Sequence, residues 1–176
     1  MKLFMLALVT TALARTPLPN ISPGDPALVF SLPALNAGSS RDATVPARVG
    51  LSDYTGLKPT TPASAVVVHF FSARQEAELD ALNRLQKRYG AKGAQMVAIA
   101  IDDGDLGDLA DWVAGQKLVY PVLRDAYGVV AGRYGATAPP LTFIVDGDGA
   151  VFAIGQPSPG ELESEIEKEL QVLIAK

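Results

Sequence analysis

Cysteine is missing from all 176 residues of the sequence, and histidine occurs once. Without cysteine no disulfide can form, so packing and hydrogen bonds alone must stabilise the fold. Catalysis by a thiolate, the reactive form of cysteine, is excluded as well. Zinc, copper, iron–sulfur and c-type haem sites are not expected, because they need thiolate or several imidazole ligands. A glycine-rich phosphate loop is also absent, so we expect no cofactor.

Positive charge is scarce. The sequence has 15 Lys and Arg against 19 Asp and Glu, a net charge of -4, and its basic residues are dispersed. Nucleic-acid binding needs clustered basic residues, so no nucleic-acid partner is expected. An apolar content of 48% with 19% charged residues is typical of globular proteins, and the length suits one domain with a real core.

A hydrophobic run long enough to cross a bilayer is also missing, since a spanning helix needs roughly 20 apolar residues. The shorter apolar run from Leu3 to Val9 follows Lys2 and precedes small residues up to Ala14. This pattern predicts a secretory signal cleaved after Ala14, with a short membrane anchor as the alternative. We expect a protein of the bacterial periplasm or exterior, with no stable membrane span after signal removal. The predicted organisation is a signal peptide at 1–14, an extended lead-in at 15–27 and one domain at 28–176.

Two continuous apolar runs, Ala65–Phe71 and Gln95–Ile101, predict central strands that are covered on both faces. Between them, apolar side chains recur every three or four residues from Glu76 to Tyr89, which predicts an amphipathic helix. A strand, a helix and a strand in this order form a parallel pair with a right-handed crossover. Further strands are predicted at Val29–Leu32, Val49–Leu51, Val119–Leu123, Leu141–Val145 and Ala150–Ile154, and further helices at Leu106–Gln116, at Ala126–Tyr134 and from Pro159 onward.

Two pairs of these strands are expected to form hairpins. The strands near Val29 and Val49 form an N-terminal hairpin, and the last two strands flank a turn at Asp146 to Gly149. Asp146 and Asp148 are therefore interpreted as turn residues rather than ligands.

Several short segments lie in an order that is informative: Pro23–Ala27, Phe30–Leu32, Leu51–Gly56, Val119–Asp125 and Val130–Gly135. Together they resemble the redoxin branch of the thioredoxin fold, which comprises TlpA- and ResA-like thiol-disulfide reductases and AhpC/TSA peroxiredoxins. The resemblance implies an α/β, thioredoxin-like fold with a central mixed β-sheet flanked by helices and an N-terminal β-hairpin extension.

The same resemblance implies where the family's cysteines would stand. Glu78 and Leu79 resemble the family's residues on the helix after the central strand. Counting back from them puts the two reductase cysteines at Ser72 and Gln75, with Phe71 in place of a tryptophan. In the peroxiredoxin alignment the peroxidatic cysteine falls at Gln75 and a Thr or Ser at Ser72. Either alignment leaves the site without sulfur, so no catalytic residue is predicted.

A second family feature is retained in Ala138–Asp146, which resembles a segment whose cis proline faces the cysteine pair. The resemblance carries that position to Pro140. Backbone beside such a proline can hydrogen-bond an extended peptide, although Pro140 can also serve only as a fold-shaping turn. The candidate partner-binding groove consists of Phe71, Ser72, Arg74, Gln75, Pro139 and Pro140.

Other polar residues have structural interpretations. His69 lies inside the central strand and is predicted to be a satisfied buried histidine. Ser72 lacks a credible base, so serine hydrolysis is not expected. Helix capping and solvation account for the densest acidic group. That group consists of Asp102, Asp103, Asp105 and Asp108.

Two hypotheses about the function of the protein remain. The leading hypothesis is a non-catalytic thioredoxin-like protein outside the cytoplasm that binds a protein or peptide partner. The alternative is a redoxin that keeps a thiol-disulfide or antioxidant-associated role without cysteine, for example as the docking partner of a cysteine-bearing homologue.

Overall fold

A five-stranded mixed sheet forms the centre of the computed structural model, which describes residues 21–38, 45–72, 76–101, 106–158 and 160–175. The strand order is β5-β4-β3-β6-β7. Strands β3, β4 and β5 run parallel, whereas β6 and β7 are antiparallel to their neighbours. The strands of this sheet are β3 (Ala65–Phe71), β4 (Ala94–Ala100), β5 (Val122–Arg124), β6 (Leu141–Asp146) and β7 (Val151–Gly155).

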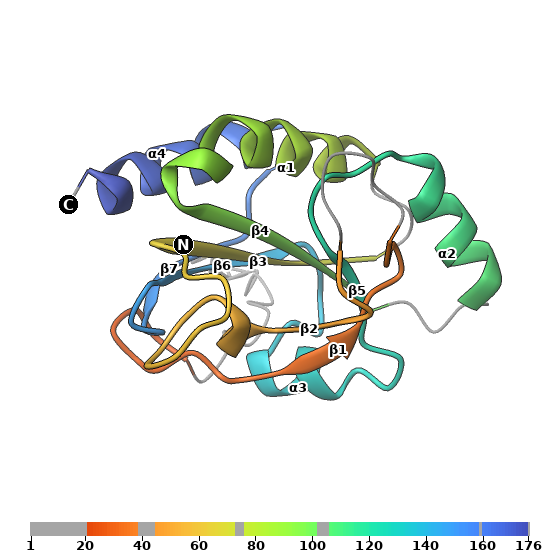
Figure 1. Cartoon of the computed structure of the whole chain (residues 1–176), viewed down its shortest axis with the longest axis horizontal. Helices are drawn as coiled ribbons and strands as arrows, with labels where there is room; N and C mark the ends of the chain where they lie inside the picture. The colour runs from red at the N-terminus through yellow and green to blue at the C-terminus, as the bar shows by residue number, and fades with distance from the viewer. Residues whose placement is uncertain (1–20, 39–44, 73–75, 102–105, 159, 176) are drawn as a thin grey trace, which may run out of the picture.

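Helices cover both faces of this sheet, and a small hairpin lies on one of them (Figure 1). On one face α1 and α4 lie side by side, with α2 beside them, and on the other lie α3 and the hairpin of β1 and β2. The helices are α1 (Glu76–Tyr89), α2 (Leu106–Gly115), α3 (Val129–Tyr134) and α4 (Leu162–Ile174), with 3-10 turns η1 (Leu51–Asp53) and η2 (Gly90–Lys92). The hairpin strands are β1 (Ser31–Pro33) and β2 (Arg48–Gly50). The predicted mixed sheet and N-terminal hairpin are confirmed.

The central strand β3 divides the core in two because its side chains alternate between the faces of the sheet. Val67 and Phe71 pack with α1 and α4. Val66, Val68 and Phe70 pack against the α3 side, where Phe70 contacts Tyr134 and Phe143. Every residue of β3 is buried, which explains why its sequence is a continuous apolar run rather than an alternating one.

The strand predicted at Val119–Leu123 begins later than expected, at Val122. The side chain of Asn36 explains this shift, because it donates to the Tyr120 carbonyl at 2.8 Å and accepts the Val122 N–H at 3.0 Å. A buried amide therefore satisfies backbone groups that a neighbouring strand would otherwise bond. At the N-terminal end of β5 the hydrogen-bond partner of the backbone is therefore a side chain. The periodicity of a strand does not reveal such a partner.

Helix α3 is also shorter than the predicted Ala126–Tyr134 and begins at Val129. The buried carboxylate of Asp125 accepts the N–H groups of Val129 and Ala131 at 3.1 and 2.7 Å. These contacts satisfy the free donors of the first turn and fix where the helix starts. Gly128 precedes it with a φ of 61°, a left-handed conformation that glycine adopts readily.

Residues at the start of the described chain pack against the last strand. Ile21 is buried in the core on the α3 side. Gly24 donates to the Val151 carbonyl at 2.7 Å, and the Val151 N–H donates to Asp25 at 2.8 Å. The segment from 21 to 27 is therefore bound to the first residue of β7 and to the turn before it. The predicted signal peptide, 1–14, and the rest of the lead-in lie outside the described residues. Within the described chain, none of the helices has the length and apolar character needed to cross a membrane.

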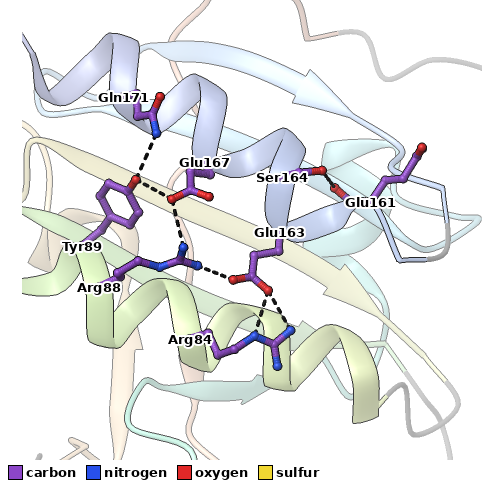
Figure 2. A network of polar contacts seen from close by, with 8 residues as sticks. All are labelled: Arg84, Arg88, Tyr89, Glu161, Glu163, Ser164, Glu167 and Gln171. Carbon is purple, nitrogen blue, oxygen red and sulfur yellow. Dashed lines mark hydrogen bonds and ion pairs between the residues drawn. The ribbon is translucent and has the colours of Figure 1, made fainter.

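A polar network joins α1 to α4 on the outer side of the helix pair (Figure 2). Arg84 contacts Glu163 at 2.7 Å, and Arg88 bonds both Glu163 and Glu167. The Tyr89 hydroxyl donates to Glu167 at 2.7 Å. The network fixes α4 along α1, in addition to the apolar contacts beneath it.

This network predicts a pH-dependent contribution of Glu163 to stability. The hydrogen bond from Arg84, with the charges of Arg84 and Arg88, lowers the pKa of Glu163 below 4.5. A carboxylate with a lowered folded-state pKa stabilises the protein above its unfolded pKa, and the contribution is lost as pH falls through the folded-state value. We expect Glu163→Gln to lower the free energy of unfolding by up to about 1 kcal/mol at pH 7, since the pair is partly exposed.

Urea unfolding at several pH values measures this effect. The gap between wild type and Glu163→Gln should shrink once the pH drops below about 4.5. Glu161→Gln, an exposed position before the same helix, serves as the control and should leave stability unchanged. A gap that stays constant down to pH 3 would contradict the assigned role of Glu163.

Candidate functional site

The candidate site lies at the C-terminal end of β3, where the chain leaves the sheet and enters α1. Phe70 pairs with Leu141 in the β3–β6 ladder. The antiparallel register therefore brings the residues after Phe70 next to those before Leu141. Ser72 and Pro140 thus come to the same end of the sheet, as the resemblance implied. The peptide bond between Pro139 and Pro140 is cis.

The predicted groove residues differ in exposure. Ser72, Pro139 and Pro140 are partly exposed. Phe71 has no exposed surface and packs in the core with α1 and α4, so its side chain is not available to a partner. Its backbone is not free either, because the Phe71 carbonyl accepts the Ile101 N–H at 3.1 Å, so Phe71 does not contribute exposed surface to the predicted groove. Arg74 and Gln75 lie outside the described residues.

His69 lies directly behind this end of the strand and is fully buried. Its Nδ1 is 2.9 Å from the Thr142 hydroxyl on β6. Its Nε2 is 2.9 Å from Oε2 of Glu78, in the first turn of α1. The interpretation of His69 as a satisfied buried histidine is therefore correct, and its two partners are now identified.

The chemistry of the donors fixes the arrangement of protons in this group. An ionised carboxylate only accepts hydrogen bonds, so His69 Nε2 carries a proton toward Glu78. When the ring is neutral, Nδ1 then accepts the hydrogen of the Thr142 hydroxyl. The Glu78 side chain is 19% exposed, so the group runs from the core toward the surface beside the start of α1. It ties the helix to the two strands that bring Ser72 and Pro140 together.

Sequence reasoning placed Glu78 on the helix but did not connect it to His69. A usable signal was present, because a lone buried histidine needs a polar partner, and the next glutamates along the chain are Glu76 and Glu78. Residue Glu76 is exposed, and Glu78 is the one that reaches the ring. Thr142 follows 73 positions after His69 and is brought to it only by the sheet register.

The acidic candidates that the structure describes do not join the site. Asp108 is exposed on α2, and the other three members of the acidic group, at positions 102, 103 and 105, lie outside the described residues. Asp146 accepts the N–H groups of Asp148 and Ala150, which is the turn role predicted for it. Among the described residues no group of three or more His, Asp or Glu side chains is arranged to hold a metal ion.

Comparison with known families settles the relationship of the chain. The sequence model of the AhpC/TSA family matches residues 23–154. The chain belongs to the AhpC/TSA family. This confirms the resemblance to redoxins, and it does so for a family member whose sequence contains no cysteine.

Curated relatives of this AhpC/TSA chain include thiol-disulfide oxidoreductases named ResA. Those of Bacillus thuringiensis (strain Al Hakam) and Bacillus anthracis are each 30% identical over 95 residues, which is 53% of this chain and 54% of theirs. The chain thus matches about half the length of these relatives. Their activity is not transferred to it by this match.

Solved structures resemble the AhpC/TSA chain over a larger share of its length. A protein assigned as the thiol:disulfide interchange protein DsbE from Chlorobium tepidum has a TM-score of 0.71 and 25% identity, over 88% of this chain and 99% of that one. The peroxidoxin BcpB from Mycobacterium tuberculosis has a TM-score of 0.68 and 22% identity, over 89% and 98%. At such low identity the second match supports the fold alone. The predicted thioredoxin-like fold is confirmed.

Proposed function

We propose that the protein is a non-catalytic thioredoxin-like domain that acts outside the cytoplasm and binds a protein or peptide partner. The observation that carries this proposal is the absence of cysteine from a chain of the AhpC/TSA family. Thiol–disulfide exchange requires attack by a thiolate on a disulfide sulfur, and no side chain of this protein can supply that atom. The site retains exposed residues and backbone groups, and these can bind a protein or peptide partner.

The proposed contact surface consists of Ser72, Pro139 and Pro140. These three residues are partly exposed, and they adjoin the end of the β3–β6 ladder. Extended backbone at such a position can pair with a bound peptide. The buried group of His69, Glu78 and Thr142 supports this surface from behind, because it holds the start of α1 against β3 and β6. A rigid support of this kind favours binding without rearrangement.

The proposed location rests on the first residues of the sequence. The charged, apolar and small-residue pattern of 1–14 is typical of a secretory signal. We therefore propose that 1–14 are removed, that 15–27 form a lead-in and that 28–176 form the domain. One structural neighbour, at 19% identity, is described as a secreted Mycobacterium tuberculosis disulfide oxidoreductase, which is consistent with this location.

A redox-associated role is the second candidate, and the ResA relatives favour it. In that case the protein docks onto a cysteine-bearing homologue or its substrate without exchanging disulfides itself. Insulin-reduction and peroxide-consumption assays of a cysteine-bearing redoxin, run with and without this protein, separate the two candidates, because only the redox-associated role predicts a changed rate. Turnover above the blank by the purified protein would contradict the non-catalytic proposal.

Site-specific photo-cross-linking tests the proposed surface. With a photo-reactive phenylalanine in place of Ser72, we expect covalent adducts of discrete mass in the compartment where the protein resides, and loss of most of them after Pro140→Ala. The same phenylalanine at Ser164, an exposed position on α4, is the matched control. Adducts that form equally well at Ser164, or that are unchanged by Pro140→Ala, would place the binding surface elsewhere.

A further inference from the structure

A cavity of about 260 Å³ lies between α4 and the outer strands β6 and β7. Its walls are apolar and its floor is the buried residue Thr142. The Thr142 hydroxyl is already engaged with His69. The volume is just under the range of about 300 to 1,000 Å³ typical of drug-sized ligands, so a small ligand fits. The apolar walls are formed by Ile144, Ala153, Pro157 and Ile166.

The mouth of this cavity carries unneutralised negative charge. Glu165, Lys168 and Glu169 of α4 line it. Glu163 and Glu167 of the same helix are paired with arginines of α1. Glu165 and Glu169, in contrast, make no ion pair with any other residue that the structure describes. Two carboxylates against one ammonium leave the mouth with a net negative charge.

Gly155 on β7 brings one of these carboxylates over the opening. A Cβ built at Gly155 would lie 4.0 Å from Oε2 of Glu165, and among the described residues no other heavy atom outside the glycine and its two chain neighbours lies within that distance. The Glu165 carboxylate thus lies above the strand at the cavity mouth instead of extending away from the helix. The glycine also leaves the opening unobstructed. Its backbone is not left-handed, so a larger residue can be introduced without strain.

We propose that this cavity binds a small organic amine, with a short apolar body in the cavity and a protonated ammonium group at Glu165 and Glu169. Apolar walls favour an apolar body because binding removes its surface from water. The carboxylates at the mouth favour a cation, and charge-assisted hydrogen bonds to them are stronger than neutral ones. This site shares no residue with the proposed partner surface, but its floor, Thr142, belongs to the group that supports that surface.

Three probes of equal chain length test the proposal on the full-length protein. Hexylammonium, hexan-1-ol and hexanoate are titrated at low salt, and binding is followed by NMR chemical shifts of the backbone. Hexylammonium is expected to bind at least ten-fold more tightly than hexan-1-ol, and hexanoate more weakly than either. In 0.5 M NaCl the advantage of the ammonium probe should fall, because salt screens charges at the mouth.

Variants assign the binding to this cavity. The double variant Glu165→Gln, Glu169→Gln should remove the preference for hexylammonium over hexan-1-ol. Glu161→Gln, outside the cavity lining, is the control and should keep it. Gly155→Val should lower the affinity for all three probes, because the larger side chain narrows the opening of the cavity. Equal affinities for the three probes, no saturable binding, or an unchanged preference in the double variant would each overturn the proposal.

Discussion

Replacing Glu78 by leucine is expected to lower the free energy of unfolding by about 3 kcal/mol, because the change leaves a buried polar group without its partner. His69 has no exposed surface, and its Nε2 bonds the Glu78 carboxylate. Without that carboxylate the ring must either bury an unpaired N–H or distort the packing beneath α1. Chemical denaturation, followed by circular dichroism, measures the loss.

A double-mutant cycle separates this cause from a general loss of helix stability. His69→Leu with Glu78→Leu removes both polar groups of the pair but leaves the buried Thr142 hydroxyl without His69, so it should still cost about 1 to 3 kcal/mol, less than the two single variants added together. Glu76→Leu, an exposed position in the same helical turn, is the matched control and should change stability by less than about 0.5 kcal/mol. If the double variant loses as much as the two single variants added together, His69 and Glu78 are not coupled.

Replacing Phe70 by alanine is expected to cost about 4 kcal/mol. Phe70 is fully buried in the central strand, and its ring centroid lies 5.3 Å from that of Tyr134 and 6.1 Å from that of Phe143. Truncation removes apolar burial and leaves a cavity between rings that are held by the sheet and by α3. For a domain of this size the loss corresponds to a fall in Tm of roughly 8 to 16 °C.

Thermal unfolding of matched variants measures this second effect. Phe70→Leu keeps part of the volume and should cost less than half as much. Leu57→Ala removes a similar apolar side chain that is fully exposed, and it should leave Tm unchanged. A Phe70→Ala protein that melts within about 2 °C of wild type would mean that the aromatic cluster on the α3 side contributes little to stability.

The sequence predicts best those elements whose pattern depends on burial alone. The apolar run Ala65–Phe71 and the periodic segment Glu76–Tyr89 have the same bounds in the structure as in the prediction. Prediction is poorer where a distant side chain supplies backbone hydrogen bonds. Asn36 does so at the start of β5 and Asp125 at the start of α3. Local periodicity contains no information about such contacts.

The candidate site was likewise predictable only in part. Its position at the end of β3 beside Pro140 follows from the order of the elements and from the resemblance to redoxins. The burial of Phe71 and the pairing of His69 with Glu78 could not be predicted in this way, because both depend on how α1 lies against the sheet. No sequence pattern predicts the cavity below α4. It depends on the lack of a side chain at Gly155 and on how α4 packs against the sheet, and the periodicity of apolar residues reports neither.

The pairing of Gly24 and Asp25 with Val151 has a consequence for the order of folding. These residues are made early during synthesis, but their partner strand is made late, so their contact has a long sequence separation and a high entropic cost. The early segment can therefore pair with the start of β7 only after nearly the whole chain has been synthesised. Until then the backbone groups of this segment lack their partner and are open to pairing with other chains, which makes this a stage of biogenesis prone to aggregation.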